Sequence, residues 1–188
     1  MPNTYFSDPL IFLIDTLFSL YILIVAFRII MQWAQWEYHH PIVQLIIKAT
    51  QVPVKTLRRF IPPIGRWDTA TIVLLFALTF FKLFLINAIQ SGQAYPGFFL
   101  GWLLADVFSL FITIFTFSII FEVVLSWVIP PGSENPIKPL IHSMNQPLLK
   151  PIRQVMPAMG ALDLSPLVAV IGLQLLSMLV IPLLIGQV

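Results

Sequence analysis

The chain has 188 residues, of which 59% are apolar and only 10% are charged, and its mean hydropathy is +0.94. Soluble domains are about half apolar and about a quarter charged, so this composition excludes a water-soluble globular protein and indicates an integral membrane protein. The formal net charge is +2, and the chain contains no cysteine, which excludes disulfides, thiolate nucleophiles and cysteine-ligated metals.

Four segments are long and apolar enough to cross about 30 Å of hydrocarbon. They run approximately from Leu10 to Ala34, from Ala70 to Gln90, from Phe98 to Ile129 and from Leu164 to Ile185. The residues before the first segment include Asp8 but no Lys or Arg, unlike a cleavable signal peptide, so we expect this segment to be retained as a span. The predicted fold class is an all-α membrane protein with four transmembrane helices in one membrane domain, residues 1–188.

The connection between the first two spans recurs between the last two, about 95 positions later in the chain. When Trp33 is aligned with Trp127 and one extra residue is allowed in the second copy, seven identical pairs follow. They are Pro41 and Pro136, Gln51 and Gln146, Lys55 and Lys150, Arg58 and Arg153, Pro62 and Pro157, Gly65 and Gly160, and Asp68 and Asp163. Identities in register indicate a duplicated unit. We therefore expect two parallel helix-loop-helix repeats, at about residues 10–92 and 98–188.

Each connection contains two short amphipathic stretches that are too charged to span. In the first copy, Ile42, Leu45 and Ile46 recur at helical spacing, and Val54 and Leu57 follow among cations. We expect short cytoplasmic interfacial helices in each repeat, with apolar faces in the acyl boundary and cations at the anionic headgroups of membrane lipids. The alternative is that the apolar faces cap the helix bundle. The cations expected to bind lipid or a partner are Lys48, Lys55, Arg58, Arg59, Lys150 and Arg153.

Each connection ends in a repeated motif of proline, glycine and aspartate. The motif residues are Pro62, Gly65, Asp68, Pro157, Gly160 and Asp163. Proline and glycine stop a helix and turn the chain, and an aspartate can cap the next helix. The motif therefore marks the turn into the second span of each repeat.

The basic residues predict the topology. Eight of the ten Lys and Arg residues lie in the two connections: Lys48, Lys55, Arg58, Arg59, Arg66, Lys138, Lys150 and Arg153. Because Lys and Arg accumulate in cytoplasmic loops, we expect both connections in the cytoplasm and both termini outside it.

The stretch from Gln146 to Pro166, QPLLKPIRQVMPAMGALDLSP, resembles the signature of the YggT family of small bacterial membrane proteins, which is related to the YlmG proteins. The first copy departs from it, with Val52 and Thr56 where the second copy has Pro147 and Pro151. The resemblance covers essentially the whole chain and is to the two-repeat bacterial form. It implies a place in the bacterial inner membrane and a link to hyperosmotic tolerance and potassium uptake, and it supplies no catalytic residue.

Four charged residues inside the spans form two sets at matching depth. Arg28 and Glu122 are equivalent in the two repeats, and Lys82 and Asp106 lie equally far from the outer end of their spans, with Asp15 as a competing partner. An unpaired ion in a membrane is costly, so we expect Arg28 to pair with Glu122 and Lys82 with Asp106. Such pairs either set helix register or form part of an ion path.

No enzymatic motif appears in the chain. There is no phosphate-binding glycine loop and no Ser/His/Asp set, and His39 and His40 lie beside Glu37 without a third spaced ligand. We expect no enzyme activity, no cofactor, no metal and no nucleic-acid partner. The favoured function is a membrane scaffold, assembly or stress-tolerance factor that holds anionic lipid and either a second copy or another membrane protein. The alternative is a potassium channel or transporter component that uses the intramembrane charges.

Overall fold

The computed structural model describes residues 4–65, 67–91, 99–129, 135–155 and 163–186. Within these ranges the chain forms six helices and no strand. They are α1 (Thr4–Trp33), α2 (Pro41–Leu57), α3 (Thr69–Ser91), α4 (Phe99–Val128), α5 (Ile137–Val155) and α6 (Ser165–Leu184). Four of them, α1, α3, α4 and α6, are long and apolar enough to span a membrane. The protein therefore has the predicted all-α, multi-pass membrane fold.

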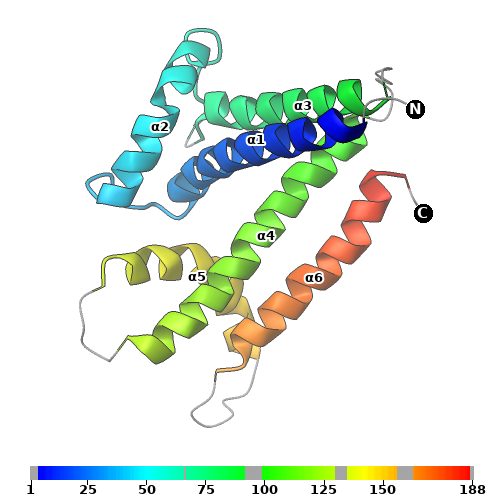
Figure 1. Ribbon diagram of the computed structural model, residues 1–188. Helices are drawn as coiled ribbons and strands as arrows, with labels where there is room; N and C mark the ends of the chain where they lie inside the picture. The colour runs from blue at the N-terminus through cyan, green and yellow to red at the C-terminus, as the bar shows by residue number, and fades with distance from the viewer. Residues whose placement is uncertain (1–3, 66, 92–98, 130–134, 156–162, 187–188) are drawn as a thin grey trace.

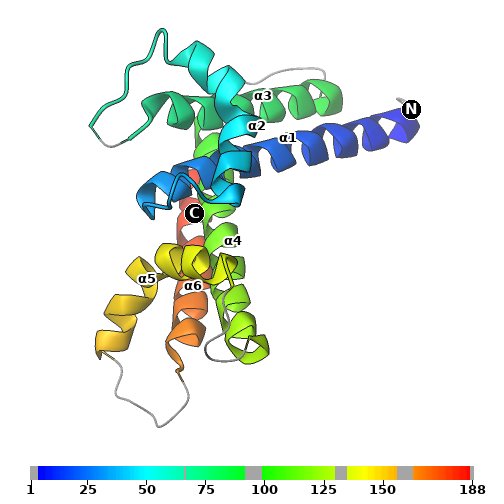
Figure 2. The same cartoon turned by 90° about the vertical axis from the view of Figure 1, so that its left-hand side faces the viewer.

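The two repeats form two helical hairpins. In the first, α1 packs along α3, and in the second, α4 packs along α6 (Figure 1). Both α1 and α4 run toward the end of the molecule where α2 and α5 lie, which we call the basic end (Figure 1). The start of α1 and the end of α6 lie at the opposite end. The repeats thus run in the same direction, as predicted, but their hairpins cross each other (Figure 2).

The amphipathic segment of each repeat is one continuous helix, where the sequence suggested two short ones. α2 continues through Pro53, and α5 continues through two prolines. A proline has no N–H, so the carbonyl four residues earlier loses its partner. In α2 this carbonyl belongs to Ala49, and the Tyr21 hydroxyl of α1 donates a hydrogen bond to it at 3.2 Å. Thus α1 replaces the donor that Pro53 lacks.

The buried faces of α2 and α5 pack against the spans. α2 buries Val43, Ile46, Thr50 and Val54, and α5 buries Leu140, Ile141, Met144, Asn145 and Leu149. These residues have the capping arrangement, which corrects the expectation that Ile46 and Val54 lie in the acyl boundary. Ile42 and Leu45, expected on the same apolar side, are exposed. The larger apolar cluster joins both repeats, because it contains residues of α1, α2 and α3 together with residues of α4 and α5.

α1 ends in a left-handed turn at a residue that is not glycine. Gln35 has a φ of +54°. The N–H of Trp36 donates to the carbonyl of Met31 at 2.9 Å, which is the hydrogen bond of a Schellman motif. The left-handed conformation costs a non-glycine residue about 1–2 kcal/mol. This turn directs the chain toward the start of α2.

α4 and α6 make backbone contact at the end opposite to the basic end. Gly101 of α4 faces Leu184 of α6 so closely that a Cβ at position 101 would overlap the Leu184 carbonyl oxygen. Gly172 of α6 has open space where its Cβ would lie. Small residues allow this approach in lipid, where helices associate by close packing.

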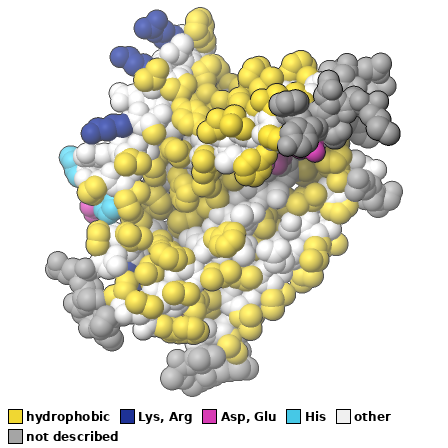
Figure 3. Space-filling view, viewed as in Figure 1, with side chains coloured by type: hydrophobic (Ala, Val, Ile, Leu, Met, Phe, Trp, Pro, Cys, Tyr) yellow, Lys and Arg dark blue, Asp and Glu magenta, His cyan; other side chains and the backbone are white. Residues whose placement is uncertain are grey.

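The surface is mostly apolar. In Figure 3 apolar side chains cover much of the visible face, and Lys and Arg side chains gather at the edge formed by α2. Exposed apolar side chains are normal on helices that contact acyl chains. The polar groups that remain inside the molecule are therefore the features that identify a site.

Candidate functional site at the basic end

A buried polar cluster joins three helices of the first repeat. The Nη1 atom of Arg28 on α1 donates to Thr50 Oγ1 on α2 at 2.7 Å, and its Nη2 atom lies 3.8 Å from Asp68 Oδ2. Asp68 also accepts two hydrogen bonds from Arg58, at 3.2 and 2.6 Å, and one from Thr71 at 2.8 Å. Asp68 precedes α3, so this single carboxylate links all three helices.

The Arg58–Asp68 contact is a strong, bidentate ion pair. Burial alone would raise the pKa of the Asp68 carboxyl. Hydrogen bonds from Arg58 and Thr71, with the charges of Arg58 and Arg28, outweigh burial and hold that pKa below its ordinary value. The hydrogen bonds between Arg58 and Asp68 in turn raise the pKa of Arg58. The Arg58–Asp68 pair is therefore ionised at neutral pH.

The second repeat has a polar cluster at the equivalent position but with different chemistry. Glu122 of α4, the counterpart of Arg28, accepts a hydrogen bond from Asn145 Nδ2 of α5 at 2.7 Å. Asn145 is the counterpart of Thr50, and its Oδ1 atom accepts from Ser118 at 2.9 Å. His142 Nδ1 lies 2.8 Å from the other Glu122 oxygen. In each repeat, therefore, the charged residue of the first span binds the amphipathic helix of the same repeat.

This arrangement corrects the expected Arg28–Glu122 pair. Within the described part of the chain, Arg28 contacts the first repeat and Glu122 contacts the second, and the two share no partner. The two residues occupy equivalent positions in the two repeats, but each belongs to a separate polar cluster. The structure does bring Lys82 and Asp106 together, with Nζ 2.8 Å from Oδ2, and Asp15 lies 3.5 Å from the same Nζ.

The motif that ends each connection forms a matching ion pair in both repeats. Arg153 Nη2 lies 2.9 Å from Asp163 Oδ2, as Arg58 lies against Asp68. Asp163 also accepts from the Ser165 N–H at the start of α6. Burial would raise the pKa of Asp163, but the hydrogen bonds from Ser165 and the Arg153 charge lower it. Arg58 and Arg153 therefore bind aspartates of their own repeats, and because both side chains stay partly exposed, their expected contact with lipid remains a prediction.

The proline and glycine of the motif shape the first connection. The Pro62 carbonyl accepts a hydrogen bond from Thr69 Oγ1 at 2.6 Å, and Gly65 takes a φ of +60°. Pro157 and Gly160 of the second copy lie outside the described residues, as does Arg66. The described part of the motif therefore joins the end of the amphipathic helix to the next span.

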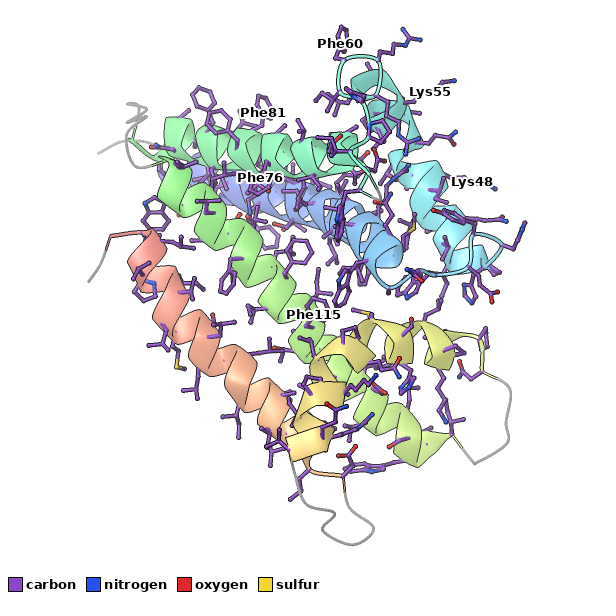
Figure 4. The ribbon with its side chains drawn as sticks, turned by 180° about the vertical axis from the view of Figure 1, so that it is seen from behind. Lys48, Lys55, Phe60, Phe76, Phe81 and Phe115 are labelled. Carbon is purple, nitrogen blue, oxygen red and sulfur yellow. The ribbon has the colours of Figure 1, made fainter. Side chains whose placement is uncertain are left out.

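Five cations at the basic end are exposed and make no ion pair with any described residue: Lys48, Lys55, Arg59, Lys138 and Lys150. On α2 and just after its end, three of these cations alternate with apolar residues along one face. That face, which we call the exposed row, consists of Leu45, Lys48, Val52, Lys55 and Arg59. Lys48 and Lys55 point away from the hairpins (Figure 4). The spacing of three and four residues keeps these side chains on one side of the helix.

Two positions on the corresponding face of α5 contact the first repeat instead. Trp36 Nε1 donates to the Leu140 carbonyl at 3.1 Å and to Ser143 Oγ at 2.9 Å. Leu140 and Ser143 are the counterparts of Leu45 and Lys48 in the exposed row. Sequence reasoning missed this contact because Trp36 has no counterpart in the second copy, and this lack of a match was the signal that could have marked it.

His40 makes a second link between the repeats. Its Nδ1 atom accepts from the Ile42 N–H and caps α2, and its Nε2 atom lies 3.1 Å from the Pro136 carbonyl. This pattern fits a neutral imidazole that donates through Nε2. His40 thus joins the start of α2 to the residue just before α5.

The chain is similar to known proteins over nearly its whole length. An uncharacterized protein of Pseudomonas aeruginosa is 40% identical over 174 residues, which cover 91% of this chain and 87% of the relative. A protein of Vibrio alginolyticus from the proC 3′ region is 37% identical over 171 residues, covering 89% and 91%. The uncharacterized protein YggT of Escherichia coli (strain K12) is 32% identical over 171 residues, covering 91% and 88%.

No solved structure matches the chain at a significant level. A family model described as CCB3/YggT matches it twice, at residues 7–89 and again at residues 101–184. The two matches fall on the two hairpins, one on each repeat. The chain therefore belongs to the CCB3/YggT family.

Proposed function

We propose that the protein is a non-enzymatic membrane scaffold, an assembly or stress-tolerance factor that holds anionic lipid at the cytoplasmic face of the bacterial inner membrane. In this proposal the basic end faces the cytoplasm, and the start of α1 and the end of α6 lie on the other side. The positive-inside rule supports this orientation, because the connections carry most of the Lys and Arg residues.

The observation that carries the proposal is the exposed row of α2. Its cations have no ion-pair partner among the described residues, and they alternate with Leu45 and Val52, which are 65% and 75% exposed. Phe60, just after α2, is 79% exposed. Such a face suits the membrane interface, where apolar side chains enter the acyl boundary and lysine stems extend toward phosphates. Each cation near an anionic surface contributes about 1 kcal/mol.

The polar clusters suit a rigid scaffold. Arg28–Thr50 and Glu122–Asn145 each fasten an amphipathic helix to its own span, and Trp36 joins the repeats. A platform held in this way presents its cations in a constant arrangement. The exposed apolar side chains of α6 offer a surface for lipid, for a second copy or for another membrane protein.

Cation transport is the weaker alternative. The cavity between the two hairpins, about 690 Å³, is lined by apolar side chains apart from Thr113 and Ser118. The carboxylates of Glu122 and Asp106 already contact His142 and Lys82, respectively. A path for a cation needs polar groups that replace its hydration shell. Potassium flux into liposomes that depends on Glu122, tested with Glu122→Gln, would favour transport over the scaffold.

The test neutralises together the four exposed cations that the sequence predicts to bind lipid, as Lys48→Gln, Lys55→Gln, Arg59→Gln and Lys150→Gln. We expect this variant to fold in detergent but to fail to restore growth of a deletion strain after hyperosmotic shock. The matched control replaces four exposed neutral residues of the same two helices by alanine: Gln44, Gln51, Gln146 and Gln154. The control should restore growth. Full restoration by the neutralised variant would overturn the proposal.

A further inference from the structure

A polar recess of about 570 Å³ opens at the basic end of the first repeat. Its walls come from the end of α1, from the segment that follows α2 and from the turn before α3. The residues that matter for its chemistry are Gln32, Gln35, Tyr38, Arg58, Trp67 and Asp68. This recess has no residue in common with the exposed row of α2, and it shares only Trp36 with the apolar cavity between the hairpins.

The charged groups at the recess do not balance. Arg28 and Arg58 both contact Asp68, so two guanidinium groups face one carboxylate and leave one positive charge. The Arg28 Nε–H is buried without a hydrogen-bond partner. Arg58 binds Asp68 through Nε and Nη2, and its Nη1 group has no described partner. An excess positive charge beside a polar hollow attracts an anion.

The neutral lining supplies hydrogen-bond donors to the same hollow. The Oε1 atom of Gln32 lies 3.4 Å from the Asp68 N–H, an orientation that leaves the amide NH₂ of Gln32 for another acceptor. Gln35 lines both this recess and an adjoining hollow of about 260 Å³. Trp67 and Tyr38 are exposed aromatic residues with N–H and O–H groups. Residues of these two types concentrate at the headgroup level of membranes.

Gln35 is also the residue in the left-handed turn at the end of α1. Glycine is the usual residue there because it takes a positive φ without cost. Strained backbone of this kind is concentrated at functional sites. A glutamine that keeps its amide at the recess in spite of the strain is expected where that amide binds a ligand.

We propose that this recess binds the phosphate group of an anionic ligand, with Arg58 and the amides of Gln32 and Gln35 as its donors. Phosphate oxygens accept several hydrogen bonds, and guanidinium groups match them geometrically. The phosphate belongs either to an anionic lipid headgroup or to a free phosphate. The proposal goes beyond the scaffold function because it assigns one discrete site, and it does not depend on the exposed cations of α2.

The second repeat provides an internal contrast. At the equivalent positions Glu122, Arg153 and Asp163 carry one excess negative charge when His142 is neutral. Gln32 is replaced there by Ser126, whose hydroxyl donates within its own helix to Val123. We therefore expect one phosphate site in the chain, in the first repeat, although both repeats carry the Arg–Asp pair.

The experiment titrates the full-length protein in neutral detergent with dioleoylphosphatidylglycerol and counts bound lipid by native mass spectrometry. The test variant is Gln32→Ala with Gln35→Gly, and the control is Ser126→Ala. We expect one tight site in the wild type and in the control, and about tenfold weaker binding in the test variant, because it loses hydrogen bonds to a charged group. Gln35→Gly alone is measured as a second test variant; it relieves the left-handed strain, so loss of binding by this variant would not reflect unfolding.

Competition with inorganic phosphate identifies the source of the phosphate. Displacement of the tight lipid by inorganic phosphate would support a site for free phosphate, and retention of the lipid would support a headgroup site. Equal lipid binding by the wild type and the test variant would overturn the proposal, as would the absence of any tight site. The variant with four neutralised cations should keep the tight site, so failure of the scaffold proposal and failure of this one give different results.

Discussion

Asp68 and Asp163 occupy the same position in the two repeats and bind the same kind of partner, but their surroundings differ. The Asp68 side chain is 4% exposed and that of Asp163 is 47% exposed. Asp68 also compensates the buried charge of Arg28. Removing one partner of a buried pair leaves an uncompensated charge, whereas an exposed pair contributes little. Asp68 should therefore contribute more than Asp163 to the free energy of unfolding.

Asp68→Asn should lower the free energy of unfolding by about 3–5 kcal/mol at neutral pH. Asp163→Asn should lower it by about 0–1 kcal/mol. Thermal or denaturant unfolding of the purified protein in detergent measures both changes. Equal losses in the two variants would show that burial does not distinguish the repeats.

Acid should weaken the same contacts. The folded-state pKa values of Asp68 and Asp163 lie below the ordinary value, so their stabilisation is fully present above the unfolded pKa, about 3.9, and is lost as pH falls through the folded pKa. The melting temperature should therefore drop below about pH 4. This drop should be smaller in Asp68→Asn, and an identical acid profile in that variant would rule out Asp68 as a source of it.

The separate clusters of Arg28 and Glu122 predict independent energetics. The exchange Arg28→Glu with Glu122→Arg should show no rescue, and the two losses should add within about 0.5 kcal/mol. By contrast, Glu122→Ala and Asn145→Ala remove the same contact and should show coupling of about 0.5–3 kcal/mol. A double-mutant cycle by denaturant unfolding distinguishes the cases, and partial rescue by the exchange would place the two charges in contact.

At the scale of the elements, the close approach of α4 and α6 depends on one glycine. Gly101→Ala should destabilise the protein, because the new methyl group would overlap the Leu184 carbonyl oxygen. Gly172→Ala is the matched control: it should be neutral or stabilising by up to about 1 kcal/mol, since alanine favours helix and the site is open. Melting temperatures followed by circular dichroism test both. A neutral Gly101→Ala would mean that the helices can separate without loss.

The spans and the duplication could be predicted from the sequence, because membrane-spanning length and identities such as Trp33 with Trp127 are linear properties of the chain. The partners of Arg28 and Glu122 could not. Depth along a span follows from residue counting, but the rotation of each helix about its axis depends on packing. The same limit applies to α2, where periodicity identified an amphipathic helix but did not reveal which face the bundle covers. The sequence also did not reveal that Tyr21 donates to the Ala49 carbonyl and so replaces the donor that Pro53 lacks.

At the scale of the whole molecule, few polar contacts join the two hairpins. Trp36 links the first repeat to α5, and His40 links it to Pro136, the residue just before α5. Lys82 links α3 to α4 at the other end. Trp33 adds an edge contact with Phe115, with ring centroids 5.6 Å apart. The relative placement of the hairpins thus depends on contacts at both ends of the spans.

Trp36→Phe should loosen this placement while leaving each hairpin folded. The substitution removes an indole N–H that satisfies two acceptors of α5, and we expect a loss of about 1–3 kcal/mol in the free energy of unfolding. Trp127→Phe is the control, since Trp127 is 79% exposed. Distances between spin labels on α2 and α5 should broaden in Trp36→Phe only. An unchanged distance distribution would mean that the apolar contacts, and not the Trp36 hydrogen bonds, hold the two hairpins in place.

The hydrogen bond between Tyr21 and Ala49 determines more than the continuity of α2. The Ala49 carbonyl reaches the Tyr21 hydroxyl only when α2 is turned to one particular angle about its own axis. That angle also decides where every other side chain of the helix points, including Lys48 and Lys55. The Tyr21 hydrogen bond, together with the Arg28–Thr50 hydrogen bond, therefore sets the direction in which the helix presents its positive charges.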